Sequence, residues 1–453
     1  MRFAFWLLVG AVALAPLPFA SNRPWAWSLL GTIVAVALIA WAIACLRGAD
    51  AVPVAPRRVW VLLVLFAALL ALFAVQAVPW TPVAWHHPLW AEAAAVLGRP
   101  LRGAISLDPA ATTAAAMRFA TYGAIFWIAL QGGRARRRAR AALLVLVVAG
   151  FGYCAYGLFV DFSGANAILW FERWAYQDSV TSTFVNRNAF ASYAGIVLIV
   201  TLGRLVDEAG RAGGEQPLTR AGLRALVEFL AGRGGLLVVG AATAGFALLF
   251  TDSRGGLVSV VFALVVLALL VGLSRHRRPA AAIAQAAAVA TLGLVVVNLA
   301  GDVALDRLAR TVLDEEQRLA VYESLARAIV ANPWTGVGLG SFATTFSLVR
   351  DVDLIRAGTY LKAHNGYLEW AFEGGVPALA LIVLLIGSAA AACVAGALRR
   401  RRDAAYPGIA AAVVTLVAVH SLVDFGPQTP AVAATVALVL GIGCAQSWRE
   451  GEG

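Results

Sequence analysis

A short polar stretch carries the side chains that are best suited to chemistry. Residues 360–375, YLKAHNGYLEWAFEGG, lead directly into a long apolar run. His364 is the only histidine of the long segment before this run, and Lys362 is the only lysine of the chain. Because imidazole titrates near neutral pH, a histidine here can accept a proton from an attacking hydroxyl group. We therefore interpret His364 as a candidate general base, with Lys362 and Asn365 as possible supporting residues.

Three arginines stand at the ends of apolar runs or on an apolar face, where a charge is costly. Arg187 opens one apolar run, Arg254 lies in the short turn TDSRGG between two others, and Arg318 shares a helical stripe with apolar side chains. Guanidinium groups bind phosphate oxygens through paired hydrogen bonds and stay charged when partly buried. The three arginines favour a site for an anionic, phosphate-bearing ligand that needs no metal ion. For Arg187, the alternative is an arginine that only reaches the membrane interface; for Arg254, it is a solvated turn.

Two further pairs of polar residues leave alternatives open. His420 and Asp424 are four residues apart and so share one face of a helix. Asp424 is a possible supporting residue of the site, and a purely structural role is the alternative. Asp351 and Asp353 match a short Asp-x-Asp metal motif, but a three-residue match is weak evidence for a metal site. We expect neither a metal ion nor another cofactor.

The elements that must position these groups are membrane helices. The chain of 453 residues is 61% hydrophobic and only 13% charged, with a mean hydropathy of +0.80. Many of its apolar runs reach the roughly 20 residues that a helix needs to cross a bilayer. The four cysteines lie inside such runs without the spacing of a metal site. We predict an all-α integral membrane protein with about twelve spans.

The basic residues predict how these spans are oriented. The expected spans are 3–20, 26–46, 59–78, 111–131, 140–161, 188–205, 234–251, 254–274, 279–298, 375–397, 404–424 and 430–448. Arginines gather in every second connection, as in RGADAVPVAPRR, GGRARRRAR and RRRRD. Because connections rich in lysine and arginine stay in the cytoplasm, both termini are predicted to be cytoplasmic. The net charge of +11 thus reports membrane orientation, and nucleic-acid binding is not expected.

One connection is long enough to form an extramembrane domain. We divide the chain into three parts: spans one to nine in residues 1–298, a loop domain in residues 299–374, and spans ten to twelve in residues 375–453.

The first span, 3–20, is expected to be an uncleaved helix because no clean cleavage site follows it. We find no internal repeat, which argues against a transporter built from repeats.

The loop domain is predicted to contain an amphipathic helix and a glycine-rich turn. The segment RLAVYESLARAIVA indicates a helix of about a dozen residues that ends before Pro333. Its period places Arg318 and Tyr322 on the apolar stripe and Arg327 on the opposite face. The following TGVGLGSF lacks the strand and the lysine of a phosphate-binding loop. We interpret it as a turn in which the backbone approaches another segment closely.

Taken together, these motifs resemble the O-antigen ligase and O-antigen polymerase superfamily of bacterial membrane glycosyltransferases. The resemblance rests on His364-Asn365, nine residues and Gly375-Val376-Pro377, which is similar to a His-Asn-x9-Gly-x-x-Gly signature. It extends to TFVNRNAFASY, to Ser253-Arg254-Gly255 and to the run from Arg318 to NPWTGVGLGSF. One departure is Ala378, which stands where the signature has its last glycine.

The resemblance implies a fold, a donor and a set of roles. It implies a helical, multi-pass protein of the bacterial inner membrane with a periplasmic loop domain over the active site. The donor would be an undecaprenyl-diphosphate-linked glycan, and transfer would be metal-independent. By resemblance, Arg254 and Arg318 bind the diphosphate, His364 activates the acceptor, and Arg187 is a fourth member of the site. A non-enzymatic flippase for lipid-linked glycan is the alternative.

The acceptor separates two activities that use the same donor. A ligase transfers the glycan to lipid A-core, and a polymerase transfers it to a second lipid-linked glycan. The loop from Asp302 to Lys362 holds eight acidic and seven basic residues, so a strong attraction to a phosphate-rich acceptor is not evident. The face of His420 and Asp424, with the turn at Pro427 and Pro430, is a plausible lining for a second groove. Both observations favour polymerisation slightly.

Overall fold

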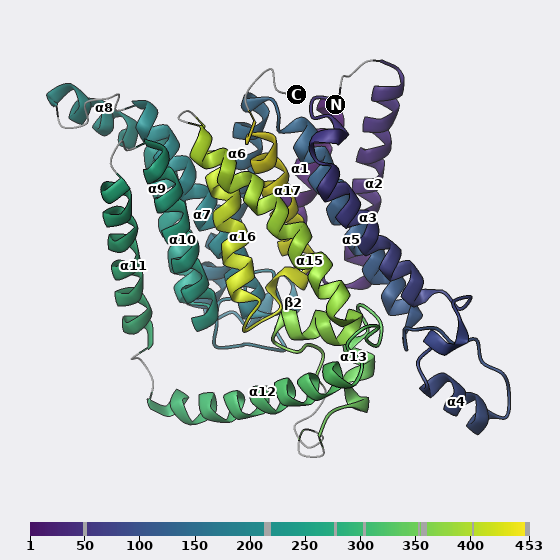
Figure 1. The fold of residues 1–453 in the computed structure, drawn as a ribbon. Coiled ribbons are helices and arrows are strands. Elements are labelled where there is room, and N and C mark those ends of the chain that lie inside the picture. The colour runs from purple at the N-terminus through teal and green to yellow at the C-terminus, as the bar shows by residue number, and fades with distance from the viewer. Residues whose placement is uncertain are drawn as a thin grey trace.

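The structure is a bundle of membrane helices with one long helix lying across its end (Figure 1). This computed structural model describes residues 1–48, 52–212, 219–275, 279–301, 305–351, 354, 360–400 and 403–448. The bundle consists of α1 (Arg2–Leu14), α2 (Pro24–Leu46), α3 (Trp60–Ala77), α5 (Pro109–Gly132), α6 (Arg136–Phe162), α7 (Arg187–Ala212), α9 (Arg233–Leu249), α10 (Arg254–Arg275), α11 (Pro279–Gly301), α15 (Gly366–Arg399), α16 (Ala405–His420) and α17 (Pro430–Ala445). Each of these helices overlaps a predicted span, which confirms the all-α membrane fold.

The remaining elements are short or lie outside the bundle. They are α4 (Leu89–Leu97), α8 (Arg220–Ala231), α12 (Leu305–Ala331), α13 (Phe342–Thr345), the hairpin of β1 (Ala167–Ile168) and β2 (Phe171–Glu172), and the 3₁₀ turns η1 (Phe19–Ser21), η2 (Pro56–Arg58), η3 (Val83–Trp85), η4 (Phe346–Leu348) and η5 (Gly426–Gln428). The start of α1 and the end of α17 lie on one side of the bundle, which we call the termini face (Figure 1). The opposite side, crossed by α12, is the α12 face.

Several helices have different lengths from the predicted spans. Among the described residues, eight helices are long and apolar enough to cross a membrane, and four shorter apolar helices, α1, α9, α16 and α17, accompany them. Helix α1 ends at Leu14 because two prolines, Pro16 and Pro18, follow and cannot continue it. Helix α16 ends at His420, four residues before the predicted end of its span.

The short helices α16 and α17 can fall below the bilayer thickness because they pack mainly against protein. Nearly all of their side chains are buried, as are most of those in α7. Small residues bring these helices together: Gly443 of α17 lies against Ala410 of α16, and Gly195 of α7 lies against Leu416 of α16. A Cβ at either glycine would collide with its neighbour, so the backbones approach closely without a hydrophobic driving force.

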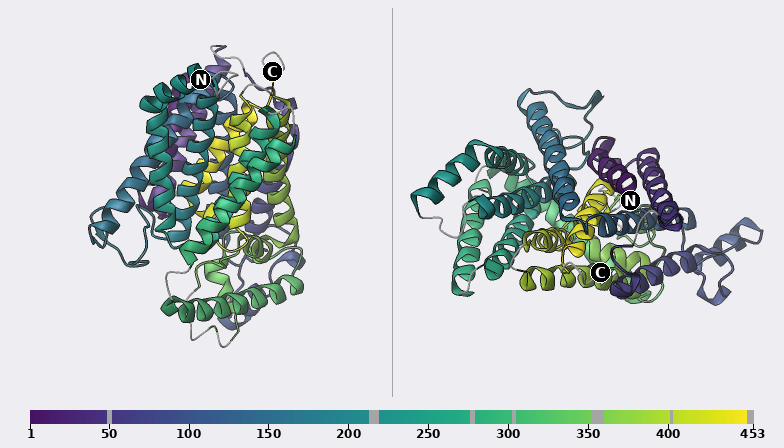
Figure 2. Two further views of the ribbon diagram at one scale, coloured as in Figure 1. Left: turned by 90° about the vertical axis from the view of Figure 1, so that its left-hand side faces the viewer. Right: turned by 90° about the horizontal axis from the view of Figure 1, so that it is seen from above.

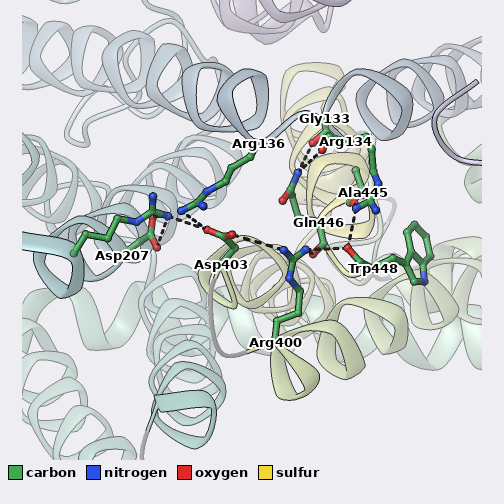
Figure 3. A network of polar contacts seen from close by, with 10 residues as sticks. Gly133, Arg134, Arg136, Asp207, Arg400, Asp403, Ala445, Gln446 and Trp448 are labelled. Carbon is green, nitrogen blue, oxygen red and sulfur yellow. Dashed lines mark hydrogen bonds and ion pairs between the residues drawn. The ribbon is translucent and has the colours of Figure 1, made fainter. Parts of the chain in front are cut away.

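Ion pairs fix the helix ends on the termini face (Figure 3). Asp403, whose side chain is only 5% exposed, accepts from Arg136 at 2.8 Å and from Arg211 at 2.9 Å, and lies 3.6 Å from Arg400. Arg400 also donates to the carbonyl oxygen of Trp448 at 3.0 Å. A buried carboxylate such as that of Asp403 needs cationic partners. The arginines that were predicted to mark orientation therefore also join the ends of α6, α7, α15 and α17.

Helix α12 crosses the α12 face below the bundle (Figures 1 and 2). It has 27 residues, so the predicted dozen was wrong at its start, although its end at Ala331, before Pro333, is confirmed. The glycine-rich segment that follows is a turn, as predicted. Gly336 has a φ of 62°, and its Cα lies so close to the Glu373 carbonyl oxygen that a Cβ would collide with it. The predicted close approach of the backbone is therefore an approach to α15.

Helix α15 changes direction where it enters the bundle. Gly375 has a φ of 70° and a ψ of 176° inside the helix, a conformation that side chains other than glycine avoid. The amide of Val376 donates to the Pro333 carbonyl oxygen at 2.8 Å, so the break is tied to the turn after α12. The first segment, from Gly366, precedes this break, and the predicted span from 375 begins at the break itself.

Candidate active site

A cavity of about 200 Å³ opens on the α12 face. Four segments contribute to it: the stretch before α7, the first turn of α7, the middle of α12 and the stretch before α15. The lining includes Tyr176, Arg187, Asn188, Arg318, Lys362 and His364. It thus unites four of the seven residues singled out in the sequence, from segments far apart in the chain.

His364 enters the cavity from the stretch before α15. Its Nδ1 lies 3.5 Å from Asp424 Oδ2, and its ring meets Phe425 edge to face, with 5.2 Å between ring centroids. Its backbone has a φ of 53°, and its carbonyl oxygen accepts a hydrogen bond from the Tyr322 hydroxyl at 2.8 Å. With Nδ1 directed at a carboxylate, Nε2 is the ring nitrogen that can accept a proton from a ligand in the cavity.

Asp424 is buried behind His364. Its side chain is 2% exposed, compared with 27% for that of His364. Oδ2 also accepts a hydrogen bond from the Asn188 side-chain amide, and Oδ1 accepts one from the Phe425 amide at 2.7 Å. Burial alone would raise the pKa of Asp424, but the hydrogen bond and positive charge of His364 outweigh it and lower that pKa below the ordinary value. The carboxylate can therefore orient the imidazole and stabilise its protonated form.

Asn365 holds His364 in place from the next position. Its Oδ1 accepts from the amides of Tyr367 at 3.1 Å and Leu368 at 3.0 Å, which caps the start of α15. Its Nδ2 donates to the Leu422 carbonyl oxygen at 2.9 Å, in the turn that carries Asp424. The residue therefore joins the two segments that bear the histidine and the carboxylate.

Lys362 lines the cavity but is engaged by protein partners. Its ammonium group donates to Glu369 at 2.8 Å and to the Gln428 side chain. The Glu369 side chain is only 1% exposed, and its other oxygen accepts from the Ala363 amide at 2.9 Å. A buried carboxylate needs such a cation nearby. Lys362 is therefore placed to fix the stretch before α15 rather than to bind a ligand.

Two arginines face the cavity from opposite sides. Arg318 projects from α12 and, in the described part of the chain, forms no ion pair. Arg327 lies on the other face of α12, where it pairs with Asp351, as the helical period predicted. Arg187 begins α7, lies 5.5 Å from the Tyr176 ring centroid and donates to Ser179 Oγ at 3.3 Å. Asp353 of the short metal motif lies outside the described residues.

Arg254 is not part of the cavity lining. It is the first residue of α10, and its side chain is exposed. A Cβ on the next residue, Gly255, would lie 2.7 Å from Val423 Cγ2 and 3.5 Å from His420 Cδ2. Arg254 therefore stands beside the turn that carries Asp424, and the structure groups only two of the three predicted arginines in one cavity.

His420 does not line a groove, which corrects the expectation from the sequence. It is 1% exposed, and its Nδ1 lies 2.7 Å from Ser192 Oγ of α7. Asp424 is equally buried. Because both side chains are buried, they cannot contact a second glycan.

Asn188 is a site residue that the sequence did not reveal. The sequence VNRNAF places two asparagines at the start of an apolar run. Asn186 caps α7, since its Oδ1 accepts from the amides of Asn188 at 2.8 Å and Ala189 at 3.0 Å. The Asn188 side chain is thereby free to reach Asp424, 236 positions further along the chain. The available signal was only a second polar residue at the start of an apolar run.

Comparison with known proteins supports the resemblance. The family model described as O-antigen ligase, Wzy_C, matches residues 239–383. No curated protein matches the chain. The matched segment runs from α9 into α15 and contains Arg254, Arg318 and His364, whereas Arg187 and Asp424 lie outside it. The match confirms the resemblance and, with the helical architecture, indicates a membrane enzyme of the O-antigen ligase and polymerase type.

Proposed function

We propose that the protein is a membrane glycosyltransferase that moves a glycan from undecaprenyl diphosphate to an acceptor hydroxyl group at the periplasmic face. The observation that carries this proposal is the pairing of His364 with buried Asp424 in the same cavity as Arg187 and Arg318. A base and cations within one cavity suit an attack on a sugar that leaves a diphosphate behind.

The proposed reaction uses each group once. The acceptor hydroxyl oxygen attacks the anomeric carbon of the glycan while His364 Nε2 accepts the hydroxyl proton. The bond from the anomeric carbon to the diphosphate oxygen breaks, and its electron pair leaves with undecaprenyl diphosphate. Arg318 and Arg187 stabilise the negative charge on the leaving group, and Asp424 stabilises the imidazolium that forms. In this scheme the arginines provide the stabilisation for which many enzymes use a metal ion.

Arg254 is proposed as a binder of the outer part of the diphosphate. Its side chain is exposed beside the Asp424 turn, and it forms no ion pair with any described residue. A long guanidinium side chain at this position can reach a ligand that extends beyond the cavity. Lys362 and Asn365 are proposed to act through the position of His364, because both contact protein groups.

The proposed location is the bacterial inner membrane, with both termini in the cytoplasm. Arginines concentrated on the termini face support this orientation, and the cavity lies on the opposite face. Residues 299–374 then form a periplasmic loop domain between the membrane regions 1–298 and 375–453. Membrane lipid and the lipid-linked donor are the proposed partners, and nucleic acid is not one of them.

The acceptor is proposed to be a second lipid-linked glycan, with lipid A-core as the alternative. The nearly balanced charge of the loop supports this assignment. The burial of His420 and Asp424 removes the other argument, a second groove along their face. Deletion of the gene distinguishes the two: single repeat units left on the carrier indicate a polymerase, and full-length polymer left on undecaprenyl diphosphate indicates a ligase.

Purified protein tests the enzymatic proposal directly. Detergent-solubilised protein is incubated with a defined polyprenyl-diphosphate glycan and candidate acceptors in the presence of EDTA, and glycan transfer is measured by mass spectrometry. Transfer that His364→Ala abolishes supports the proposal. Absence of transfer, together with movement of the lipid-linked glycan across proteoliposomes, would instead establish the flippase.

A further inference from the structure

A second hollow, an apolar groove, lies within the bundle of membrane helices. It has a volume of about 350 Å³ and runs between the end of α1 and the second half of α6. Its lining includes Leu14, Leu17, Gly152, Tyr153, Tyr156 and Thr183. Leu14 is 62% exposed and Leu17 is 43% exposed. In a bilayer these side chains face hydrocarbon, so the groove is open to lipid.

The polar side chains in this groove all turn their hydroxyl groups toward protein. The Tyr153 hydroxyl donates to the Ala13 carbonyl oxygen at 3.1 Å, and the Thr183 hydroxyl donates to the Pro16 carbonyl oxygen at 2.7 Å. The Tyr156 hydroxyl accepts from the Leu169 amide at 2.7 Å. The groove therefore presents a hydrocarbon surface and suits a ligand without polar groups.

One segment of chain connects this groove with the cationic cavity. Leu169 and Thr183 line the groove, while Tyr176 and Arg187 of the same segment line the cavity. Thr183 and Arg187 are four positions apart in the chain, so their Cα atoms are at most about 14 Å apart. A cationic site and an apolar site are thus neighbours at one end of the bundle, which is the arrangement that a ligand with an anionic head and an apolar tail requires.

We infer that the groove holds the first part of the donor's polyprenyl chain while its diphosphate lies between Arg187 and Arg318. This inference rests on the proposed function and assigns the place of the lipid tail. An engineered apolar cavity of about 150 Å³ binds one benzene molecule. The groove therefore has room for roughly two five-carbon units, with the rest of the chain in the bilayer.

Gly152 offers a way to fill the groove without disturbing the fold. A Cβ at Gly152 would meet no atom within 4 Å, so Gly152→Leu places its side chain in open space of the groove. Leucine also favours a helix more than glycine does. Gly387 of α15 likewise has nothing within 4 Å of a Cβ and is not part of the groove lining. Gly387→Leu is therefore the matched control.

The test uses a polyprenyl diphosphate that carries a photoreactive diazirine on its first isoprene units. After irradiation of the detergent-solubilised full chain, we expect labelled peptides that contain residues 13–17 and 149–156. Gly152→Leu should weaken binding of the probe about tenfold, the effect of two methylene groups left unburied. Gly387→Leu should leave labelling and binding unchanged. Ala149→Leu, which adds volume at another residue of the groove lining, provides a second variant.

The outcomes separate the inference from the proposed function. Labelling confined to other peptides, or equal binding by Gly152→Leu and the wild type, would overturn the groove assignment even when glycan transfer is normal. Labelling of the groove by an ordinary phospholipid probe with equal strength would also overturn it, because the groove would then hold bulk lipid. Groove labelling that Gly152→Leu removes supports the assignment, and transfer activity measured in parallel tests the proposed function separately.

Discussion

Asp424 Oδ2 lies 3.5 Å from His364 Nδ1, and the carboxylate is buried behind the imidazole. The two residues come from different connections, one before α15 and one after α16. Arg187 and Arg318 lie around the same cavity. This histidine–carboxylate pair is the relationship on which the proposed chemistry depends, because an imidazole held in one orientation is the better proton acceptor.

The first prediction concerns the carboxylate of the pair. Asp424→Asn keeps the shape of the side chain and removes its charge, so the imidazolium loses its stabilising partner. We expect kcat to fall about 10²- to 10⁴-fold, with KM for the donor nearly unchanged. Initial rates of glycan transfer across a range of donor concentrations provide the measurement. A variant with full kcat would show that Asp424 only supports the fold.

The second prediction compares two arginines of the same helix. Arg318→Ala should lower kcat about 10²- to 10³-fold, since it removes a cation from the leaving group. Arg318→Lys should also be impaired because an ammonium group cannot form the paired hydrogen bonds of guanidinium. Arg327→Ala is the matched control, and it should be mild because Arg327 pairs with Asp351 away from the cavity. Equal loss in both alanine variants would contradict the proposed role.

The third prediction concerns Asn188. Asn188→Leu retains a similar volume and removes the hydrogen bond to Asp424, so His364 should be less well oriented. A buried carboxylate that lacks one hydrogen-bond partner costs about 1–3 kcal/mol. If the activation free energy rises by a similar amount, kcat should fall roughly 10- to 100-fold. Asn298→Leu, at an exposed position of α11, is the control and should retain activity. Transfer rates that match those of the control would refute this role for Asn188.

The fourth prediction concerns pH. The pKa of Asp424 is lowered in the folded protein, so its carboxylate stabilises the fold fully above about pH 4, the unfolded aspartate value. As the pH falls through the lowered pKa, that contribution is lost. The difference in thermal unfolding midpoint between wild type and Asp424→Asn should therefore shrink as the pH falls below about pH 4. Tryptophan fluorescence during heating in detergent measures the unfolding midpoints. A difference that stays constant down to pH 3 would argue against a stabilising Asp424 carboxylate.

The fifth prediction concerns orientation in the membrane. Ser347 is exposed on the α12 face, and Arg137 is exposed on the termini face. In a chain whose native cysteines are replaced, Ser347→Cys should react with a membrane-impermeant thiol reagent in cells with a permeable outer membrane. Arg137→Cys should react only after the inner membrane is opened. The reverse labelling pattern would place the cavity in the cytoplasm and exclude the proposed periplasmic reaction.

The sequence alone was sufficient for the membrane architecture and for the direction of Arg318. A span is a local property, because every residue of an apolar run must tolerate hydrocarbon and every backbone group must find its partner within the same helix. The twelve predicted runs therefore all became helices. The helical period likewise placed Arg318 and Arg327 on opposite faces of α12, and Pro333 marked its end.

The tertiary structure decided which polar residues form the site. The pairing of Asp424 with His364 spans 60 positions, and that of Asp424 with Asn188 spans 236. Such pairs depend on how α7, α15 and α16 pack, which no local pattern records. The same packing buries His420 and leaves Arg254 outside the cavity lining. Periodicity and hydropathy report on neighbours along one helix, whereas a site between helices depends on their relative placement, and only the folded bundle determines that placement.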